Sequence, residues 1–447
     1  MADIAPLTPL RYDLARTGGT LAKVVAPPYD VIDAAQRAEL AALDPHNVVR
    51  LILPEGEGDA KYAEAARLLA GWRSEGVLVR DDEPGFYRYD QAFTPPGGGA
   101  KKTRRGFLAL VKLVPFSAGI VLPHERTLSG PKEDRLKLFR STRTNLSPGF
   151  MLYRDAAKAL DAPLARARTL GAFATPDGVE HTLSKVSEPD AVRAIVEGIG
   201  RSSLLIADGH HRYETALRYA GEIDASSGVT DPRAEHKWFM VFLANGDDPD
   251  LVVFATHRHV HGLPSFDFAG TLAKAAALFE VRRLEDGASA DVALEALRAR
   301  PSSLALCGGA GEVAILSLRT DVSLASHPTL GALPEVLRRT DVALLHAGLL
   351  ENVLGITPEA QAAKTNLWYP QDAAGALARL RSGASGASEK RDAGNALFLM
   401  NATPVSDVRA VAEAGHVMPQ KSTFFYPKVL TGLAVHTLEP ARRVASF

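Results

Sequence analysis

The feature that most constrains this chain is a short apolar strand that runs directly into a helix. Residues 202–207 form an apolar run with the length of a buried strand. Asp208 and Gly209 follow as a typical turn pair, and residues 210–220 are then rich in good helix formers. The sequence therefore predicts a strand, a tight turn and a helix N-terminus in immediate succession.

This arrangement predicts an anion site. The first backbone N–H groups of a helix lack partners within the helix and carry partial positive charge, so they attract phosphate. Gly209 allows a ligand close to the backbone, and Arg212 can offer a planar fork to phosphate oxygens. His210 and His211 can donate or move protons near neutral pH. Asp208 is expected either to cap the helix or to help hold a cation, although turn and cap chemistry alone would also explain the pair.

Helix and strand patterns alternate through the rest of the chain. Helical patterns occupy residues 59–76, 190–198, 291–300 and 371–381. Strand-like segments at 85–93 and 105–113 flank a Gly- and Pro-rich turn and predict a hairpin. The fold class is therefore expected to be α/β or α+β, with mixed sheets and flanking helices.

Length and the break near Pro189 suggest three regions in the 447 residues. We expect an N-terminal α/β domain at 1–190, a segment carrying the phosphate-binding motif at 191–265, and a C-terminal α/β region at 266–447. The tail of the last region is a candidate to return to the site.

Composition excludes several classes of protein. The net charge of −1 gives no basic excess for nucleic acid or an anionic membrane. Cys307 is the single cysteine, so no intramolecular disulfide can form, and its apolar surroundings predict a buried structural thiol. Neither a secretory leader nor about 18 uninterrupted apolar residues is present, so a cytoplasmic location without a membrane span is expected.

A polar run near residue 125 supplies further candidates. Glu125 is a candidate general base if burial raises its pKa, and His124 and Lys132 are candidates for binding phosphate. The alternative is that the charged residues at 132–135 form only a solvated helix face.

Two other segments carry candidate residues. Asp30 follows a rigid turn and could bind Mg²⁺, activate an acceptor hydroxyl, or simply cap a helix that starts near Ile32. Lys421, Ser422 and Thr423 could reach phosphate as a point charge and hydroxyl donors.

A third segment could hold a metal. His257, His259 and His261 alternate and would share one face of a strand, which makes zinc conceivable, but we expect no zinc site there. The identity of any metal ligand is left open.

Several blocks resemble the domain-of-unknown-function family numbered 1015. They run from near residue 20 to near residue 435, in the family's order, and comprise residues 26–31, 122–136, 147–148 with 152–153, 207–216 and 418–428. The resemblance thus covers almost the whole chain. The family's name implies no activity.

A strand followed by Asp-Gly-His-His-Arg and a helix is also similar to the phosphate-binding motif of the ParB/sulfiredoxin superfamily, and among its members most similar to the free-serine kinases. This resemblance implies a ParB/sulfiredoxin-like phosphate-binding core, with a further α/β region beside it. Sulfiredoxins carry a cysteine within their motif, where this chain has His210 and His211. Sulfur chemistry is therefore disfavoured, and phosphoryl transfer to a small hydroxylated metabolite, with serine as the leading candidate, is favoured.

Three functions remain as alternatives. In a kinase, ADP or ATP would place its phosphates on residues 208–212, Mg²⁺ would neutralise charge, and Glu125 or Asp30 would take the acceptor's proton. In a phosphatase acting on phosphoserine or a similar monoester, His210 or His211 would protonate the leaving oxygen or carry the phosphoryl group. A nucleotide-binding regulatory switch would use the same anion site without turnover. The sequence ranks the kinase first but does not separate it from the phosphatase.

Overall fold

The computed structural model describes residues 1–96, 98–125, 129–383 and 394–446, and its contacts divide the chain into two compact units. Unit 1 comprises residues 1–123, 127–252 and 425–447. Unit 2 comprises residues 124–126 and 253–424. The boundary predicted at residue 190 lies inside unit 1, because strands on both sides of it hydrogen-bond in one sheet. The chain instead changes unit at residue 252 and returns at residue 425.

Unit 1 is built on a large mixed sheet. Within the described residues its strand order is β6-β11-β8-β12-β5-β4-β10-β9, with β1 paired to β5. The strands are β1 (Ile4–Ala5), β4 (Phe86–Phe93), β5 (Lys102–Lys112), β6 (Val121–Leu122), β8 (Gly149–Tyr153), β9 (Arg168–Ala174), β10 (Glu180–Val186), β11 (Leu204–Asp208) and β12 (Trp238–Asn245). The predicted hairpin is confirmed, since β4 and β5 pair antiparallel on either side of the Gly-rich turn.

Two small ladders complete the strands of unit 1. They are β2 (Leu10–Tyr12) with β3 (Leu78–Arg80), and β7 (Thr144–Asn145) with β21 (His436–Thr437). The second ladder ties the C-terminal segment of the chain to unit 1.

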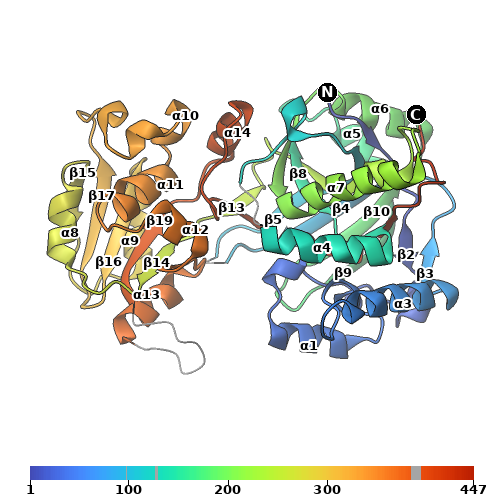
Figure 1. Cartoon of the computed structure of the whole chain (residues 1–447), viewed down its shortest axis with the longest axis horizontal. Helices are drawn as coiled ribbons and strands as arrows, with labels where there is room; N and C mark the ends of the chain where they lie inside the picture. Colours follow the sequence, from blue (N-terminus) through green and yellow to red (C-terminus); the bar gives the residue numbers. More distant parts are fainter. Residues whose placement is uncertain (97, 126–128, 384–393, 447) are drawn as a thin grey trace. The chain divides into compact units, whose positions relative to one another are not determined.

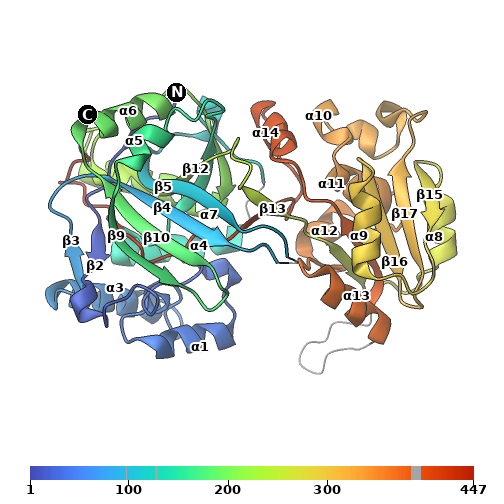
Figure 2. The same cartoon turned by 180° about the vertical axis from the view of Figure 1, so that it is seen from behind.

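The helices of unit 1 are α1 (Ala34–Leu43), α2 (Val49–Ile52), α3 (Ala60–Ser74), α4 (Ser129–Thr142), α5 (Asp161–Ala165), α6 (Pro189–Ile199) and α7 (His210–Ser227). Figure 1 shows α7 and α4 side by side over one face of the sheet, and the reverse view in Figure 2 brings β4, β5 and β10 to the front. A core cluster joins α6 and α7 to the sheet through residues such as Ile195, Tyr213 and Val241. Burial of this apolar surface holds α7, and therefore its N-terminus, against the sheet.

Unit 2 has a second, smaller sheet with the order β15-β17-β16-β19-β14-β18 in the part of the chain that is described. Its strands are β14 (Arg258–His261), β15 (Phe279–Arg283), β16 (Ser303–Gly308), β17 (Val313–Leu318), β18 (Leu367–Trp368) and β19 (Gly394–Met400). Two further strands, β13 (Val252–Phe254) and β20 (Phe424–Tyr426), span points where the chain passes between the units.

The helices of unit 2 are α8 (Phe268–Ala275), α9 (Ala290–Arg298), α10 (Glu335–Arg338), α11 (Asp341–Ala343), α12 (Pro358–Ala363), α13 (Ala373–Ser382) and α14 (Val405–Glu413), with a π-helix at Leu344–Glu351. Helices α9 and α13 bury their apolar faces on β16, β17 and β19. Cys307 lies in this core, where burial raises the pKa of its thiol to about 12, which agrees with a structural role.

Both units mix helices with sheets, so the expected mixed α/β class is confirmed. The four predicted helical patterns correspond to α3, α6, α9 and α13. No helix of the described residues combines the length and the apolar character needed to cross a membrane.

Candidate functional site

The strand, turn and helix predicted over residues 202–220 are present in unit 1. β11 ends at Asp208, and α7 begins at His210. Gly209 between them has φ +93°, a left-handed conformation that favours glycine, and it is the N-cap of α7. The guanidinium of Arg212 packs against it, since a Cβ at Gly209 would lie 3.1 Å from that group. Glycine is therefore required here for both its conformation and its lack of a side chain.

Asp208 is the centre of an ion-pair network at this turn. Lys428 donates from Nζ to Oδ2 at 3.0 Å, and Arg212 donates from Nη2 to Oδ1 at 3.1 Å. Arg212 also donates from Nη1 to the carbonyl of Pro148. Burial would raise the pKa of Asp208, but Lys428, Arg212 and His210 together lower it well below its usual range. The carboxylate is thus held charged, and its oxygens are occupied by cations.

This network corrects one expectation. Asp208 was a candidate helix cap, but Gly209 is the N-cap, and no side chain caps α7. The N-terminus of this 18-residue helix therefore has no side-chain cap at its N-cap position and no acidic residue in its first turn. Such an end favours an external anion, because the helix dipole and the outward N–H groups both attract negative charge.

The two histidines differ in environment. His210 is buried and close enough to Asp208 to help lower the pKa of that carboxyl, whereas His211 is half-buried. Adjacent helical residues point in different directions, so a single ligand meets them from different sides. His211, with more of its surface accessible, is the better placed of the two to meet a ligand from solvent.

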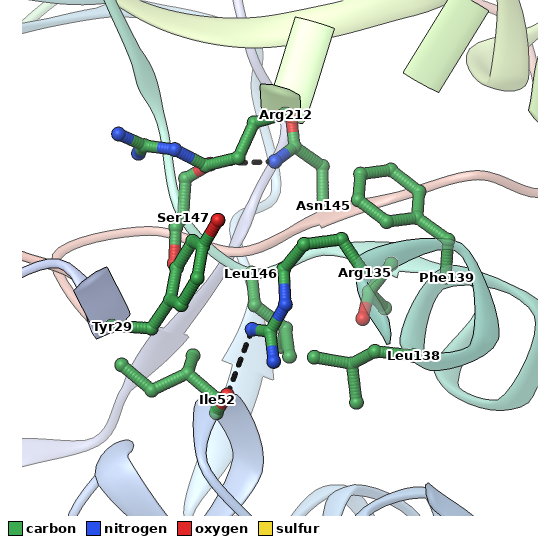
Figure 3. A pocket seen from close by; sticks show the side chains of 10 residues that line it. Tyr29, Ile52, Arg135, Leu138, Phe139, Asn145, Leu146, Ser147 and Arg212 are labelled. Carbon is green, nitrogen blue, oxygen red and sulfur yellow. Dashed lines mark hydrogen bonds between the residues drawn. The ribbon is translucent and has the colours of Figure 1, made fainter. Parts of the chain in front are cut away.

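A small pocket flanks the motif, as Figure 3 shows. The guanidinium of Arg135 lies 4.1 Å from the centre of the Tyr29 ring and donates from Nη1 to the carbonyl of Ile52 at 2.8 Å. Arg212 and Ser147 line the pocket beside the Tyr29 hydroxyl. Burial raises the pKa of Tyr29, with Arg212 acting in the opposite direction. The pocket has a volume of about 20 Å³, room for a water molecule rather than a phosphate group.

Two other predicted residues also lie in unit 1. Asp30 is exposed and follows Tyr29 in a short 3₁₀ turn (η2, Tyr29–Val31). The suggestion that it caps the next helix is wrong, because Asp33 caps α1 by accepting from the N–H of Gln36. Lys132 donates to Glu214 of α7 at 2.7 Å, so it ties α4 to α7 beside the motif.

The remaining predicted residues gather in unit 2. His124 Nε2 lies 2.9 Å from Thr423 Oγ1, and Glu125 accepts from the backbone N–H of Ser422 at 3.0 Å. The hydroxyl of Ser422 donates to the carbonyl of Pro419 at 2.5 Å, and Lys421 is exposed with φ +58°. This cluster brings together the two segments that the sequence singled out, far apart in the chain.

Of the alternating histidines, His259 and His261 lie in β14 and His257 directly precedes it, and burial lowers the pKa of His257 and His259 to about 4. His257 Nδ1 accepts from the backbone N–H of Met400 at 3.2 Å. Across the described ranges, no group of three or more His, Cys, Asp or Glu side chains is arranged to hold a metal ion.

Sequence reasoning missed three residues of the unit 1 site. Lys428 is the direct partner of Asp208, and Arg135 and Tyr29 form the flanking pocket. The signal was present, since all three lie inside the blocks that resemble the family. Their chemistry could not be assigned because the partner of each lies on a different element.

Comparisons with known proteins add the following. The model of the family described as "Protein of unknown function (DUF1015)" matches residues 4–343. No curated protein matches the chain.

Among solved structures, the chain is similar to a conserved hypothetical protein from Pyrococcus furiosus, with 15% identity and a TM-score of 0.35, over 74% of this chain and 95% of that one. It is also similar to a variant of a free serine kinase in complex with ADP, with 12% identity and a TM-score of 0.37, over 74% of this chain and 92% of that one. SbnI from Staphylococcus aureus, with its C-terminus truncated, aligns at 12% identity and a TM-score of 0.31, over 73% and 87% of the two chains.

Proposed function

Since the chain belongs to the DUF1015 family, whose description assigns no activity, we propose a function from the chemistry of its own site. The protein is a phosphoryl-transfer enzyme acting on a small hydroxylated metabolite, as a nucleotide-dependent kinase with serine as the leading acceptor. The observation that carries this proposal is the uncapped N-terminus of α7 beside a half-buried carboxylate that Lys428 and Arg212 hold charged.

Each part of this site suits phosphoryl transfer. The helix end and the two cations supply the positive potential that stabilises a transferring phosphoryl group. Gly209 removes the side chain that would keep phosphate oxygens from the backbone. His211 is accessible enough to donate to the phosphate.

We assign the role of general base to Asp30 within unit 1. Its carboxylate is exposed, so an acceptor hydroxyl can reach it, and Tyr29 next to it lines the pocket shared with Arg212. Glu125 is the alternative base named from the sequence, and it accepts from the N–H of Ser422 within unit 2. A base must lie within hydrogen-bond reach of the proton it takes, which makes the two carboxylates separable by mutation.

Mg²⁺ is part of the proposal as a companion of the nucleotide. Asp208 is already paired with two cations, so it is a poor metal ligand. Mg²⁺ commonly uses one or two carboxylates together with substrate phosphates, so the ion would arrive on ADP or ATP.

A transfer assay on the purified chain tests the proposal. One arm offers ADP or ATP with Mg²⁺ and serine, and the other offers phosphoserine alone. His211→Ala should abolish most turnover, while Arg218→Ala, on the exposed side of the same helix, should retain it. Nucleotide-dependent phosphoserine formation supports the kinase. Phosphate release from phosphoserine without nucleotide would replace it with a phosphatase, in which the histidines act on the leaving oxygen. Silence in both arms would remove serine as the substrate.

A further inference from the structure

Arg104 of β5 is a buried cation that reaches toward the site. Its guanidinium lies over the rings of Phe150 and Phe242, 4.8 and 5.3 Å from their centres. Phe150 of β8 is in register with Asp208 of β11, so the side chain of Arg104 extends along the sheet toward the turn. Burial lowers the pKa of Arg104 to about 10, and Asp208 is close enough to act against that shift.

The hydrogen bonding of Arg104 is incomplete. Nη2 donates to Oε1 of Gln91, which lies opposite on β4. Nε and Nη1 are buried and find no partner among the residues that the structure describes. A buried guanidinium normally has its donors satisfied, because an unmade bond to a charged group is expensive. Two unmet donors on one buried cation therefore point to a missing acceptor.

The local charge points to what that acceptor is. Within the described residues, Arg212 and Lys428 pair with the carboxylate of Asp208, and Arg104 is near enough to interact with it electrostatically. These three cations and one carboxylate leave two net positive charges. A phosphate monoester carries about −1.5 to −2 at neutral pH and offers three acceptor oxygens. A carboxylate would neutralise only half of the excess.

We propose that Arg104 is a further ligand-contacting residue, which binds the phosphate group from the side of the sheet and makes the site selective for dianions. This inference rests on the proposed function and deepens it. It also assigns a role to the C-terminal segment. Gln91 donates from Nε2 to the carbonyl of Lys428 at 2.9 Å, and the ring of Phe425 lies edge-on to that of Phe150. The C-terminal segment therefore packs beside Arg104 and its partner Gln91.

Titration calorimetry on the full-length chain tests this role with inorganic phosphate, pyrophosphate and ADP. Arg104→Gln should weaken all three by at least about tenfold, and Arg104→Lys should weaken them less, because charge is kept and the fork is lost. Arg105→Gln is the matched control, since the neighbouring Arg105 is exposed and should leave affinity unchanged. Binding of phosphate to the wild-type chain should rise with pH between 6 and 8 as the dianion forms, and this rise should flatten in Arg104→Gln.

A second variant guards against a misfolded Arg104→Gln. Gln91→Glu keeps Arg104 but gives it an internal carboxylate, so affinity for phosphate should again fall by about tenfold. If the wild-type chain binds phosphate and both Arg104→Gln and Gln91→Glu bind it equally well, the role of Arg104 is overturned and the proposed function stands. If the wild-type chain binds none of the three ligands, the proposed function fails, and this inference fails with it.

Discussion

Each unit contains a fully buried arginine, and the two differ in how many of their guanidinium nitrogens have a hydrogen-bond acceptor. Arg104 in unit 1 and Arg258 in unit 2 are both 1% exposed, and burial lowers the pKa of each to about 10. Arg258 donates from Nε to His346, from Nη1 to the carbonyl of Thr256 and from Nη2 to the carbonyl of Lys421. Among the residues that the structure describes, Arg104 hydrogen-bonds only to Gln91. Every guanidinium nitrogen of Arg258 therefore has an acceptor within the chain, whereas two nitrogens of Arg104 have none among the described residues.

Arg258 has a structural role, because its hydrogen bonds connect several segments of unit 2. His346 lies in the π-helix, and its Nδ1 is 2.7 Å from Oε1 of Gln361. Because Nε2 accepts from Arg258, Nδ1 must carry the proton and donate to Gln361. Burial and Arg258 lower the pKa of His346 to about 3, so the ring stays neutral at physiological pH. Arg258 thus links β14, the π-helix and residue 421 through neutral acceptors, and each of its three nitrogens has an acceptor within the chain.

The largest expected effect comes from removing each arginine in turn. Arg258→Met leaves two carbonyls and a histidine nitrogen without a donor, which should lower the free energy of unfolding by about 3–5 kcal/mol. Arg104→Met leaves only Gln91 without its hydrogen-bond partner and removes an uncompensated charge. The free energy of unfolding should therefore fall by less than about 1.5 kcal/mol. Denaturant unfolding of the two variants measures the difference.

Hydrogen exchange locates these effects, since a two-unit chain need not unfold in one step. Arg258→Met should increase exchange in residues 344–351 and leave α7 unchanged. Equal destabilisation by the two substitutions would mean that Arg104 is as fully satisfied as Arg258, and the contrast between them would disappear.

The contributions of two carboxylates to stability, Asp208 in unit 1 and Asp341 in unit 2, should depend on pH in opposite directions. The pKa of Asp208 is lowered, so its contribution is present above the unfolded value near 3.9 and is lost as pH falls toward the folded value. Asp208→Asn should therefore lower stability by about 2 kcal/mol at pH 7 and by somewhat less at pH 3, because the remainder is lost only as pH falls further toward the folded pKa.

Asp341 in unit 2 is expected to change stability in the opposite direction as pH falls. Burial and Asp407 raise its pKa to about 6, so this group favours the folded state increasingly as pH falls from about 6 toward 4. Asp341→Asn should leave stability at pH 7 unchanged or slightly raised. Urea unfolding at pH 3, 5 and 7 makes the comparison, and parallel pH profiles for the two variants would show that Lys428 and Arg212 do not hold Asp208 charged.

A smaller effect is expected at the two ends of α7. Gly209 and Gly228 both have positive φ, at +93° and +68°. A Cβ at Gly228 meets nothing within 4 Å, whereas one at Gly209 meets the guanidinium of Arg212. Gly228→Ala should cost about 1 kcal/mol from conformation alone, and Gly209→Ala about 1 kcal/mol more. Only Gly209→Ala should also weaken phosphate binding. Equal affinity in both variants would show that phosphate does not bind at the N-terminus of α7.

The sequence predicted the local part of this site and left out the part built from distant segments. The apolar run, the Asp-Gly turn and the helix formers are read from neighbouring residues, so β11, Gly209 and α7 were predicted in place. The pairing of Lys428 with Asp208 joins residues 220 positions apart, and nothing local at either residue indicates it. The pairing of β11 with β8 likewise joins strands on the two sides of residue 190, and the sequence of neither strand indicates it.

The smallest expected effect concerns two lysines of the C-terminal block 418–428. Lys421 is exposed in unit 2, whereas Lys428 pairs with Asp208 in unit 1. Lys421→Ala should change stability by less than about 0.5 kcal/mol, as for most exposed side chains, and should leave affinity for pyrophosphate unchanged. The measurement is calorimetric titration beside Lys428→Ala, which should weaken binding about tenfold. A loss of affinity in Lys421→Ala comparable with that in Lys428→Ala would place a phosphate contact in unit 2. The conclusion that only unit 1 binds phosphate would then be wrong.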